Sequence, residues 1–168
     1  MGLFDFLKKK EEPVNTISVP DDVIVAPADG EQIDIAEVSD PVFAEKMMGD
    51  GVAFRFPNAK TAICAPANGT LTVLFPTGHA FGITMANGVE LLVHIGIETV
   101  NAKGDGFKLG NKLQGQQVRA GDPIVIADFA KLSKTYDVST MLIVTNANDQ
   151  KIVFKGPGPV TKGQPIIE

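Results

Sequence analysis

From residue 23 onward, the chain consists of short apolar runs separated by turn-forming residues, and this pattern constrains the fold more than any other feature. β-Branched and aromatic residues dominate the runs, which is typical of strands. The 17 Gly and 11 Pro of the 168-residue chain, with Asn and Asp, punctuate them. The runs are VIVAPADGEQIDI (23–35), GVAFRF (51–56), TAICAPANGTLTVLF (61–75), AFGITM (80–85), VELLVHIGI (89–97), DPIVIADF (122–129), MLIVTN (141–146) and KIVFKG (151–156). The pattern predicts an all-β fold, an antiparallel β-sandwich.

Helical signals are few, and two sequence echoes accompany the strands. FAEKMMG (43–49) and DFAKLSKTYD (128–137) predict no more than short helical turns. APADG at 26–30 recurs as APANG at 65–69, and VRAGDPI at 118–124 recurs as VTKGQPI at 160–166. Pro and Gly enforce a turn beside a strand in each copy. We therefore expect a sandwich with an internal pseudo-repeat, built from two related halves.

The composition sets limits on the environment and the partners. A net charge of −5 and a pI near 5.0 leave no basic stripe for nucleic acid. The single cysteine, Cys64, cannot form an intrachain disulfide, which favours the cytoplasm. Residues 1–20 are expected to form a tail and residues 21–168 the β-sandwich domain. The tail is either mobile or an amphipathic segment that contacts the inner membrane through residues 1–12, with Lys8–Lys10 behind its apolar residues.

Both histidines of the chain flank one predicted β-hairpin. Asn87-Gly88 is a strong signal for a two-residue hairpin loop, because both residues tolerate positive φ. With such a loop, His94 lies opposite Phe81 and His79 lies opposite Gly96, so all four share one face of the sheet. The two histidines then become diagonal neighbours. A change of one residue in loop length would place them on opposite faces.

Two adjacent imidazoles could bind a metal or act as a nucleophile with a supporting ring. Two ligands are too few for a tight zinc site, and Glu90 and Glu98 are not at a recognised ligand spacing. Neutral imidazole can accept a phosphoryl group while a second ring stabilises charge. The chain has no P-loop and no GxGxxG motif, so a phosphoryl donor would be another protein or a small phosphate compound.

Two other classes compete with this interpretation. The first is a carrier domain of the lipoyl or biotinyl type, modified on Lys46; however, Glu45 precedes that lysine and MMGDG follows it, instead of the apolar flanks of a hairpin tip. The second is a zinc peptidase or other zinc-binding β-sandwich module, which would need a third protein ligand, and the chain has no further histidine.

The chain contains the motifs VFAEKMMGDGVA (42–53), GHAFGIT (78–84), GVELLVHIGIETV (88–100), KGDGF (103–107) and the initial MGLFD. Together these motifs resemble a known family, the glucose-specific IIA component of the bacterial phosphoenolpyruvate-dependent sugar phosphotransferase system. The resemblance runs from about Val23 to Ile167. It implies a β-sandwich phosphotransferase component that works without a nucleotide and requires no cofactor.

The resemblance also implies roles for individual residues. His94 would be phosphorylated on Nε2 by the histidine-containing phosphocarrier protein and would pass the group to a cysteine on the IIB domain of a sugar permease. His79 would be the supporting ring, and Thr77 would orient it. Acidic and apolar residues would bind partners around them: Asp40, Phe43, Met48, Phe75, Phe81, Leu92, Ile97, Glu98 and Val100. Some members bind regulatory targets, with zinc shared between the two histidines and the partner.

The sequence departs from the family pattern around the expected site. Glu98 stands where Asp is common, Gly78 stands in place of Asn, Met47-Met48 replaces a more β-branched pair, and FRFPNA (54–59) carries a small insertion. These changes affect the partner surface more than the histidines.

Overall fold

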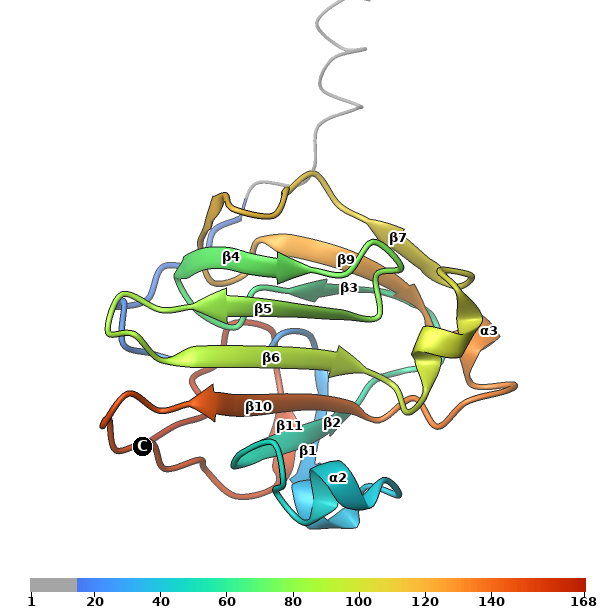
Figure 1. Ribbon diagram of the computed structural model, residues 1–168, viewed down its shortest axis with the longest axis horizontal. Helices are drawn as coiled ribbons and strands as arrows, with labels where there is room; N and C mark the ends of the chain where they lie inside the picture. Colours follow the sequence, from blue (N-terminus) through green and yellow to red (C-terminus); the bar gives the residue numbers. More distant parts are fainter. Residues whose placement is uncertain (1–14) are drawn as a thin grey trace, which may run out of the picture.

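Residues 15–168 are described by a computed structural model, in which two antiparallel sheets pack face to face (Figure 1). The eight-stranded sheet has the order β11-β1-β2-β10-β6-β5-β4-β8, and the three-stranded sheet has the order β3-β9-β7. The first half of the chain contains β1 (Gly30–Asp34), η1 (Ile35–Glu37), α2 (Pro41–Ala44), β2 (Gly51–Arg55), β3 (Lys60–Cys64), β4 (Gly69–Leu74) and β5 (Ala80–Thr84). The second half contains β6 (Glu90–Ile95), η2 (Thr99–Ala102), β7 (Phe107–Leu109), β8 (Gln117–Val118), β9 (Pro123–Asp128), α3 (Phe129–Leu132), β10 (Thr140–Asn146) and β11 (Gly158–Val160). The predicted antiparallel β-sandwich with short helical turns is confirmed.

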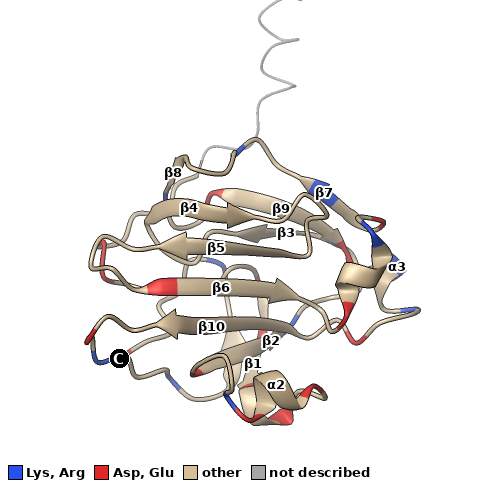
Figure 2. Ribbon diagram, in the orientation of Figure 1, with Lys and Arg blue, Asp and Glu red and all other residues tan. Residues whose placement is uncertain are grey.

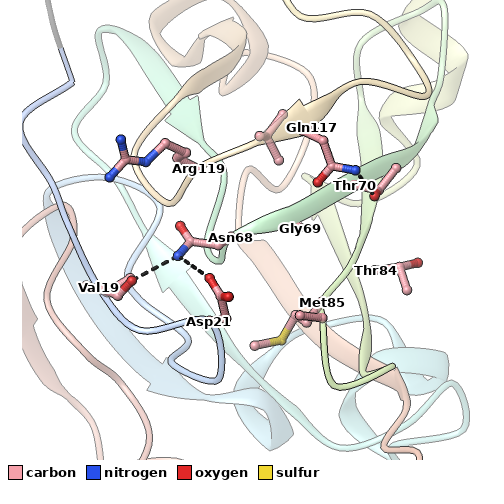
Figure 3. A pocket seen from close by; sticks show the side chains of 11 residues that line it. Val19, Asp21, Asn68, Gly69, Thr70, Thr84, Met85, Gln117 and Arg119 are labelled. Atoms are coloured by element: carbon pink, nitrogen blue, oxygen red, sulfur yellow. Dashed lines mark hydrogen bonds between the residues drawn. The ribbon is translucent and has the colours of Figure 1, made fainter.

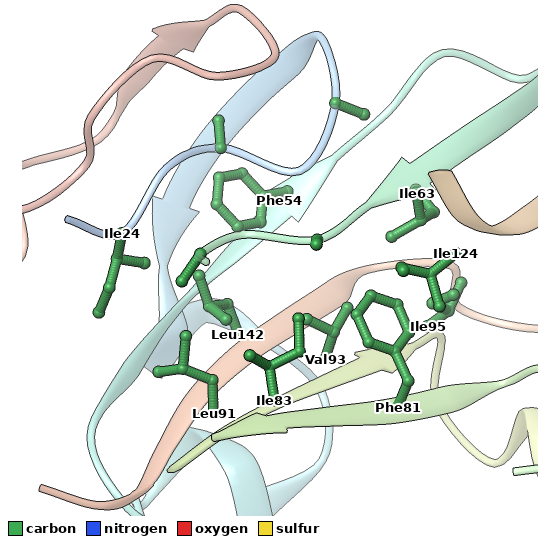
Figure 4. Close-up of a cluster of buried hydrophobic side chains, with 14 of the residues drawn as sticks. Ile24, Phe54, Ile63, Phe81, Ile83, Leu91, Val93, Ile95, Ile124 and Leu142 are labelled. Atoms are coloured by element: carbon green, nitrogen blue, oxygen red, sulfur yellow. The ribbon is translucent and has the colours of Figure 1, made fainter. Parts of the chain in front are cut away.

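The main core lies between the inner faces of the two sheets (Figure 4). Phe54, Phe81 and Ile63 are fully buried there, from β2, β5 and β3 respectively. Each large apolar side chain contributes about 1.5–3 kcal/mol when it leaves water. Inward-facing residues alternate with outward-facing ones along β6, where Leu91, Val93 and Ile95 are buried and their neighbours are more exposed. The alternation leaves one face of β6 for the site.

A second, smaller core lies on the outer face of the large sheet, under α2. Asp40 caps this helix, since its side chain accepts from the Val42 N–H (2.9 Å), and Pro41 occupies the first turn. Phe43 of α2 is buried against the sheet, and Leu92 of β6 packs at the edge of the cluster. The cluster contains Ile33, Ile35, Val38, Phe43, Ala53, Met141 and Ile143. The helix therefore covers one part of the outer face and ends beside His94.

The internal repeat is visible in the hydrogen bonds. Ala26 donates to the carbonyl of Gln164 (2.9 Å) and accepts from Gly163 N–H (3.0 Å). Ala65, its counterpart in the second copy, makes the same two bonds with residues 121–122, at 2.8 and 2.9 Å. Likewise β1 pairs with β11 and β4 pairs with β8. The two related halves predicted from the sequence echoes are confirmed.

Two parts of the chain differ from the sequence expectation. The run 151–156 forms no regular strand; Phe154 makes only an isolated bridge with Ile167. Residues 15–20, assigned to the tail, lie against the domain: Asn15 Nδ2 donates to the Ala120 carbonyl (2.8 Å) and to Asp122 (3.0 Å). The amphipathic segment expected in residues 1–12 lies outside the described residues. Within residues 15–168, none of the helices has the length and hydropathy to cross a membrane.

Candidate functional site

The hairpin between β5 and β6 has a different register from the one predicted. Ala80 pairs with His94 and Phe81 pairs with Val93, one residue away from the expected pairing. The loop has three residues, not two, because Met85 N–H bonds to the Val89 carbonyl (2.8 Å). Gly88 closes it with φ +83°, the left-handed conformation that such three-residue loops require. The prediction of a two-residue loop was therefore wrong.

This register also overturns the expectation for Phe81. Phe81 is fully buried between the sheets, on the face of β5 opposite to the site (Figure 4). It faces Val93 across the strand pair, so it stabilises the core and cannot contact a partner. Its assignment to the partner-binding surface was wrong.

The two histidine rings nevertheless lie side by side. Their centroids are 5.5 Å apart and their planes meet at 73°. The strict alternation of faces holds only within a strand, and β5 begins at Ala80, after His79. Gly78 precedes His79 with φ +79°, and a Cβ there would lie 2.8 Å from Cβ of Phe107. Glycine at 78 therefore permits the tight turn that brings His79 onto the His94 side.

A backbone carbonyl fixes the tautomer of His94. Nδ1 of His94 lies 2.8 Å from the Gly96 oxygen, and a carbonyl oxygen can only accept a hydrogen bond. Nδ1 therefore carries the proton, and the lone pair of the neutral ring is on Nε2. Gly96 holds this position with φ +82°, where an added Cβ would overlap the Thr99 side chain. The sequence interpretation only placed Gly96 opposite His79 and missed the role of its carbonyl.

The second ring is held by a hydroxyl group and a phenyl ring. Nδ1 of His79 lies 2.7 Å from Oγ1 of Thr77, and the ring of Phe75 is 5.0 Å away. His79 is 5% exposed. On the other side of the pair, the Phe43 ring lies 5.1 Å from the His94 ring. Both imidazoles are thus fixed at Nδ1 and packed against a phenyl ring.

The surroundings keep both rings neutral. Burial lowers the pKa of His94, while its hydrogen bond to Gly96 and the charge of Asp40 act in the opposite direction. Burial, and then the proximity of His94, lower the pKa of His79. Because each pKa lies below the ordinary value of about 6.5, both rings are unprotonated at neutral pH. Nε2 of His94 is available as a nucleophile.

The residues expected around the histidines differ in exposure. Met48, Phe75 and Val100 are 40%, 40% and 51% exposed. Glu98 is also exposed, with φ +58°, and Asp40 is half-buried. The remaining three, Phe43, Leu92 and Ile97, are buried or half-buried in or against the second core. Met47, outside the expected set, is 71% exposed.

The outer face of the large sheet is almost free of charge around the site. Glu90 is the one charged residue of β4, β5, β6 and β10 (Figure 2). Glu98 and Asp40 lie in the connections beside this face. The site is therefore an apolar surface with acidic groups at its border.

A separate pocket lies away from the histidines. It has a volume of about 620 Å³ and lies at the far end of β5, among Asn68, Thr84, Met85 and Arg119 (Figure 3). Asn68 Nδ2 donates to the Val19 carbonyl (2.9 Å) there. The pocket contains neither histidine, and its polar groups belong to the turn of the internal repeat. This pocket is therefore separate from the pair of histidines.

Comparison with known proteins agrees with the geometry. Residues 22–150 match the family described as phosphoenolpyruvate-dependent sugar phosphotransferase system, EIIA 1. The chain belongs to this family. It is thus a phosphotransferase relay component, which accepts a phosphoryl group from the histidine-containing phosphocarrier protein and passes it to a IIB domain. The resemblance found in the sequence is confirmed.

Relatives of this EIIA domain match over most of its length. The glucose-specific EIIA component of Haemophilus influenzae is 39% identical over 168 residues, covering 99% of this chain and 97% of that protein. The one of Buchnera aphidicola is 40% identical over 145 residues, 86% of this chain and 88% of that protein. In Staphylococcus carnosus, a glucose-specific EIICBA component is 38% identical over 86% of this chain, which corresponds to 21% of that longer protein.

A solved structure extends the comparison to the fold. Glucose permease IIA from Mycoplasma capricolum superposes with a TM-score of 0.79 at 38% identity, covering 86% of this chain and 93% of that one.

The lipoyl or biotinyl carrier and the zinc module, the two alternatives from the sequence, do not fit this EIIA domain. Lys46 has φ +59°, follows α2 and pairs with Asp50 (3.0 Å), which is not a hairpin tip. Among the described residues, no three His, Cys, Asp or Glu side chains gather to hold a metal.

Proposed function

We propose that His94 is the residue that carries the phosphoryl group, on Nε2. The single observation that supports this assignment is the hydrogen bond from Nδ1 of His94 to the Gly96 oxygen. It occupies Nδ1 and leaves the Nε2 lone pair of a neutral, half-buried ring for attack on phosphorus. His79 lacks a comparable constraint, because the Thr77 hydroxyl can donate or accept.

His79 acts as the supporting ring and Thr77 orients it. With the Thr77 hydroxyl donating to Nδ1, the proton of His79 is on Nε2, and that N–H can donate to a phosphoryl oxygen on His94. The 5.5 Å between ring centroids suits a phosphoryl group held between the rings. Phosphoryl transfer depends mainly on positioning and charge stabilisation, which this arrangement supplies without a nucleotide or a cofactor.

Partners dock on the apolar surface around the two rings. Met48, Phe75 and Val100 give it exposed apolar groups, and Asp40 and Glu98 give it acidic groups for basic residues of the carrier. Phe43, Leu92 and Ile97 support this surface from below, since they are more buried. The carrier and the IIB domain must both bring a reactive side chain to His94, so both use this surface.

The two rings can also contribute to a shared zinc site. Imidazole is a common zinc ligand, but a tetrahedral site needs four ligands and the described residues supply two. A regulatory partner would have to provide the rest, including a carboxylate. Zinc bound in this way would connect the two proteins and occupy the phosphorylation site.

The cytoplasm is the proposed compartment, because the carrier and the IIB acceptor of this relay meet the EIIA domain there. A peripheral contact of residues 1–12 with the inner membrane would bring the domain close to its permease. Deletion of residues 1–14 tests this contact: phosphorylation in solution should be unchanged, and transfer to permease in vesicles should fall. Equal transfer in vesicles would remove the membrane contact from the proposal.

The central experiment is phosphorylation of the purified protein by the phosphorylated carrier. The product should gain one acid-labile, alkali-stable phosphoryl group, located on His94 by mass spectrometry. His94→Gln should gain none, whereas His79→Gln should still be phosphorylated and so serve as the matched control. Phosphate on His79, or on no histidine, would contradict the assignment.

A further inference from the structure

The peptide group between Gly96 and Ile97 is held at both ends. Its carbonyl oxygen accepts from Nδ1 of His94 (2.8 Å), and its N–H donates to the backbone oxygen of Asp137 (2.8 Å). In a trans peptide these two groups point in opposite directions, so the two bonds together fix the plane of the group. Hydrogen bonds in such a chain also polarise one another. The orientation of His94 thus depends on the position of the Asp137 carbonyl.

The carboxylate of Asp137 fixes that carbonyl in turn. Its Oδ1 accepts from the backbone N–H of Ser139 (3.0 Å) and from the Ser139 hydroxyl (2.8 Å), so the loop 137–139 closes on itself. The Ser139 carbonyl accepts from Gly96 N–H (3.0 Å). The loop therefore holds Gly96 and Ile97, the two residues that form the peptide group bonded to His94.

The other oxygen of the same carboxylate reaches a distant segment. Oδ2 of Asp137 accepts from the Ser39 hydroxyl at 2.8 Å. Ser39 precedes Asp40, which caps α2, and α2 carries Phe43 against the His94 ring at 5.1 Å. The Asp137 carboxylate thus connects to both sides of His94. It reaches Nδ1 through the loop 137–139 and Gly96, and it reaches the ring face through Ser39, α2 and Phe43.

The electrostatic environment of Asp137 suits this role. Partial burial tends to raise its pKa, but the hydrogen bonds from Ser139 and Ser39 and the charge of Arg55 outweigh this and lower it. The carboxylate is therefore ionised at neutral pH, and its hydrogen bonds are charge-assisted. These bonds form although part of Asp137 is exposed to solvent.

We propose that Asp137 is a positioning residue for phosphoryl transfer at His94, acting through the Gly96–Ile97 peptide group and through Ser39. The inference rests on the proposed role of His94. As the carrier's phosphohistidine approaches, Nε2 of His94 donates its lone pair to phosphorus, and the N–P bond to the carrier breaks. The electron pair of that bond returns to the carrier's imidazole, and the Nδ1 proton of His94 stays on its ring, hydrogen-bonded to the Gly96 oxygen. Asp137 holds the acceptor of that hydrogen bond in place throughout.

The test compares Asp137→Ala and Ser39→Ala with Asp149→Asn, which removes one exposed negative charge beyond the end of β10 that pairs with Glu90, whereas His94 pairs with Met141 near the other end of that strand. For each variant, the melting temperature and circular dichroism establish that the domain is folded. Stopped-flow transfer from the phosphorylated carrier gives kcat and KM separately. Nitrogen NMR shifts of His94 in the unphosphorylated protein give the tautomer, and their pH dependence gives its pKa.

We expect Asp137→Ala to lower kcat about tenfold with KM unchanged, since misplacement of a reacting group has effects of this order or larger. The Nε2-protonated tautomer of His94 should appear, and its pKa should fall further, because the bond to Gly96 raises it. Ser39→Ala should give a smaller fall in kcat, and Asp149→Asn should behave as the natural protein.

Two results would overturn the inference. An unchanged His94 tautomer with kcat within about twofold of the natural protein would show that Asp137 does not position the ring. A higher KM with unchanged kcat would make Asp137 a contact for the carrier instead. The NMR measurement needs no phosphate, so it separates failure of this inference from failure of the proposed phosphorylation of His94.

Discussion

His79 meets His94 edge to face, with 5.5 Å between the ring centroids, and each ring is tied at Nδ1 to a different kind of partner. A carbonyl holds His94 and a hydroxyl holds His79. The carbonyl permits one neutral tautomer, whereas the hydroxyl permits two. This asymmetry supports the roles proposed for the two rings: His94, with one tautomer, as the nucleophile, and His79 as the ring that adapts its proton to the phosphate.

Replacement of the supporting ring should separate acceptance of phosphate from its release. His79→Gln should still be phosphorylated by the carrier but should transfer to the IIB domain about a hundredfold more slowly, the order expected when one donor to a developing charge is lost. Thr77→Val should have a smaller effect, about tenfold, because the ring remains and only its orientation is lost. Single-turnover transfer to purified IIB measures both. Equal rates for all three proteins would exclude a supporting role.

The pH dependence of phosphorylation should follow the pKa of His94. Burial lowers that pKa, so the ring stays neutral below the ordinary histidine range. The rate should therefore be constant from about pH 8 to about pH 6.5 and fall at lower pH, as Nε2 becomes protonated. Asp40→Asn should move the fall to still lower pH, because the charge of Asp40 raises the pKa of His94. A shift toward higher pH would contradict this electrostatic assignment.

The same two histidines should make the domain less stable in acid. Both have a lower pKa in the folded protein than in the unfolded chain, where it is about 6.5. Between those values the unfolded chain binds more protons, so the free energy of unfolding falls as pH drops through this window. Urea unfolding across this range measures the effect. A double variant, His79→Gln with His94→Gln, should lose this part of the pH dependence, and an unchanged dependence would contradict it.

Gly96 should tolerate no side chain. It has φ +82°, and a Cβ would overlap Thr99, so Gly96→Ala should cost more than the roughly 1–2 kcal/mol of a left-handed alanine. Gly115→Ala is the matched control, since Gly115 has φ +95° and a Cβ added there would meet no atom within 4 Å. Denaturant unfolding gives both costs. Gly96→Ala should also slow phosphorylation, whereas Gly115→Ala should not.

The sequence predicted the fold and the two histidines better than it predicted their geometry. The sandwich, its repeat and the buried face of β6 all follow from local patterns, namely alternation along strands and turn residues between them. The hairpin register does not follow from local patterns, because Asn87-Gly88 suits both two-residue and three-residue loops. The two rings lie side by side, as predicted, although the register differs. Their proximity depends on Gly78, whose turn places His79 outside the strand.

Some of the contacts that hold the site are non-local and carry no sequence signal. Ser39 and Asp137 are 98 positions apart, and nothing in a single sequence links them. Phe43 was identified only through the family resemblance, and its burial depends on the packing of α2 over the cluster that includes Met141 and Ile143. Phe81 was misplaced because one residue of register exchanges the two faces of a strand.

The apolar surface around the histidines should control binding of the carrier. Val100 is 51% exposed beside the site, and Val153 is 40% exposed in the segment that pairs near the C-terminus. Val100→Lys should raise KM for the phosphorylated carrier about tenfold or more, because it places a positive charge where the carrier brings apolar and basic groups. Val153→Lys makes the same chemical change away from both rings and should leave KM unchanged. The added charge should also make the effect of Val100→Lys weaken as salt is raised, since exposed charges are screened. If the two variants bind the carrier equally well, the docking surface does not include η2, and the approach to His94 must lie on the side of Phe75 and Met48.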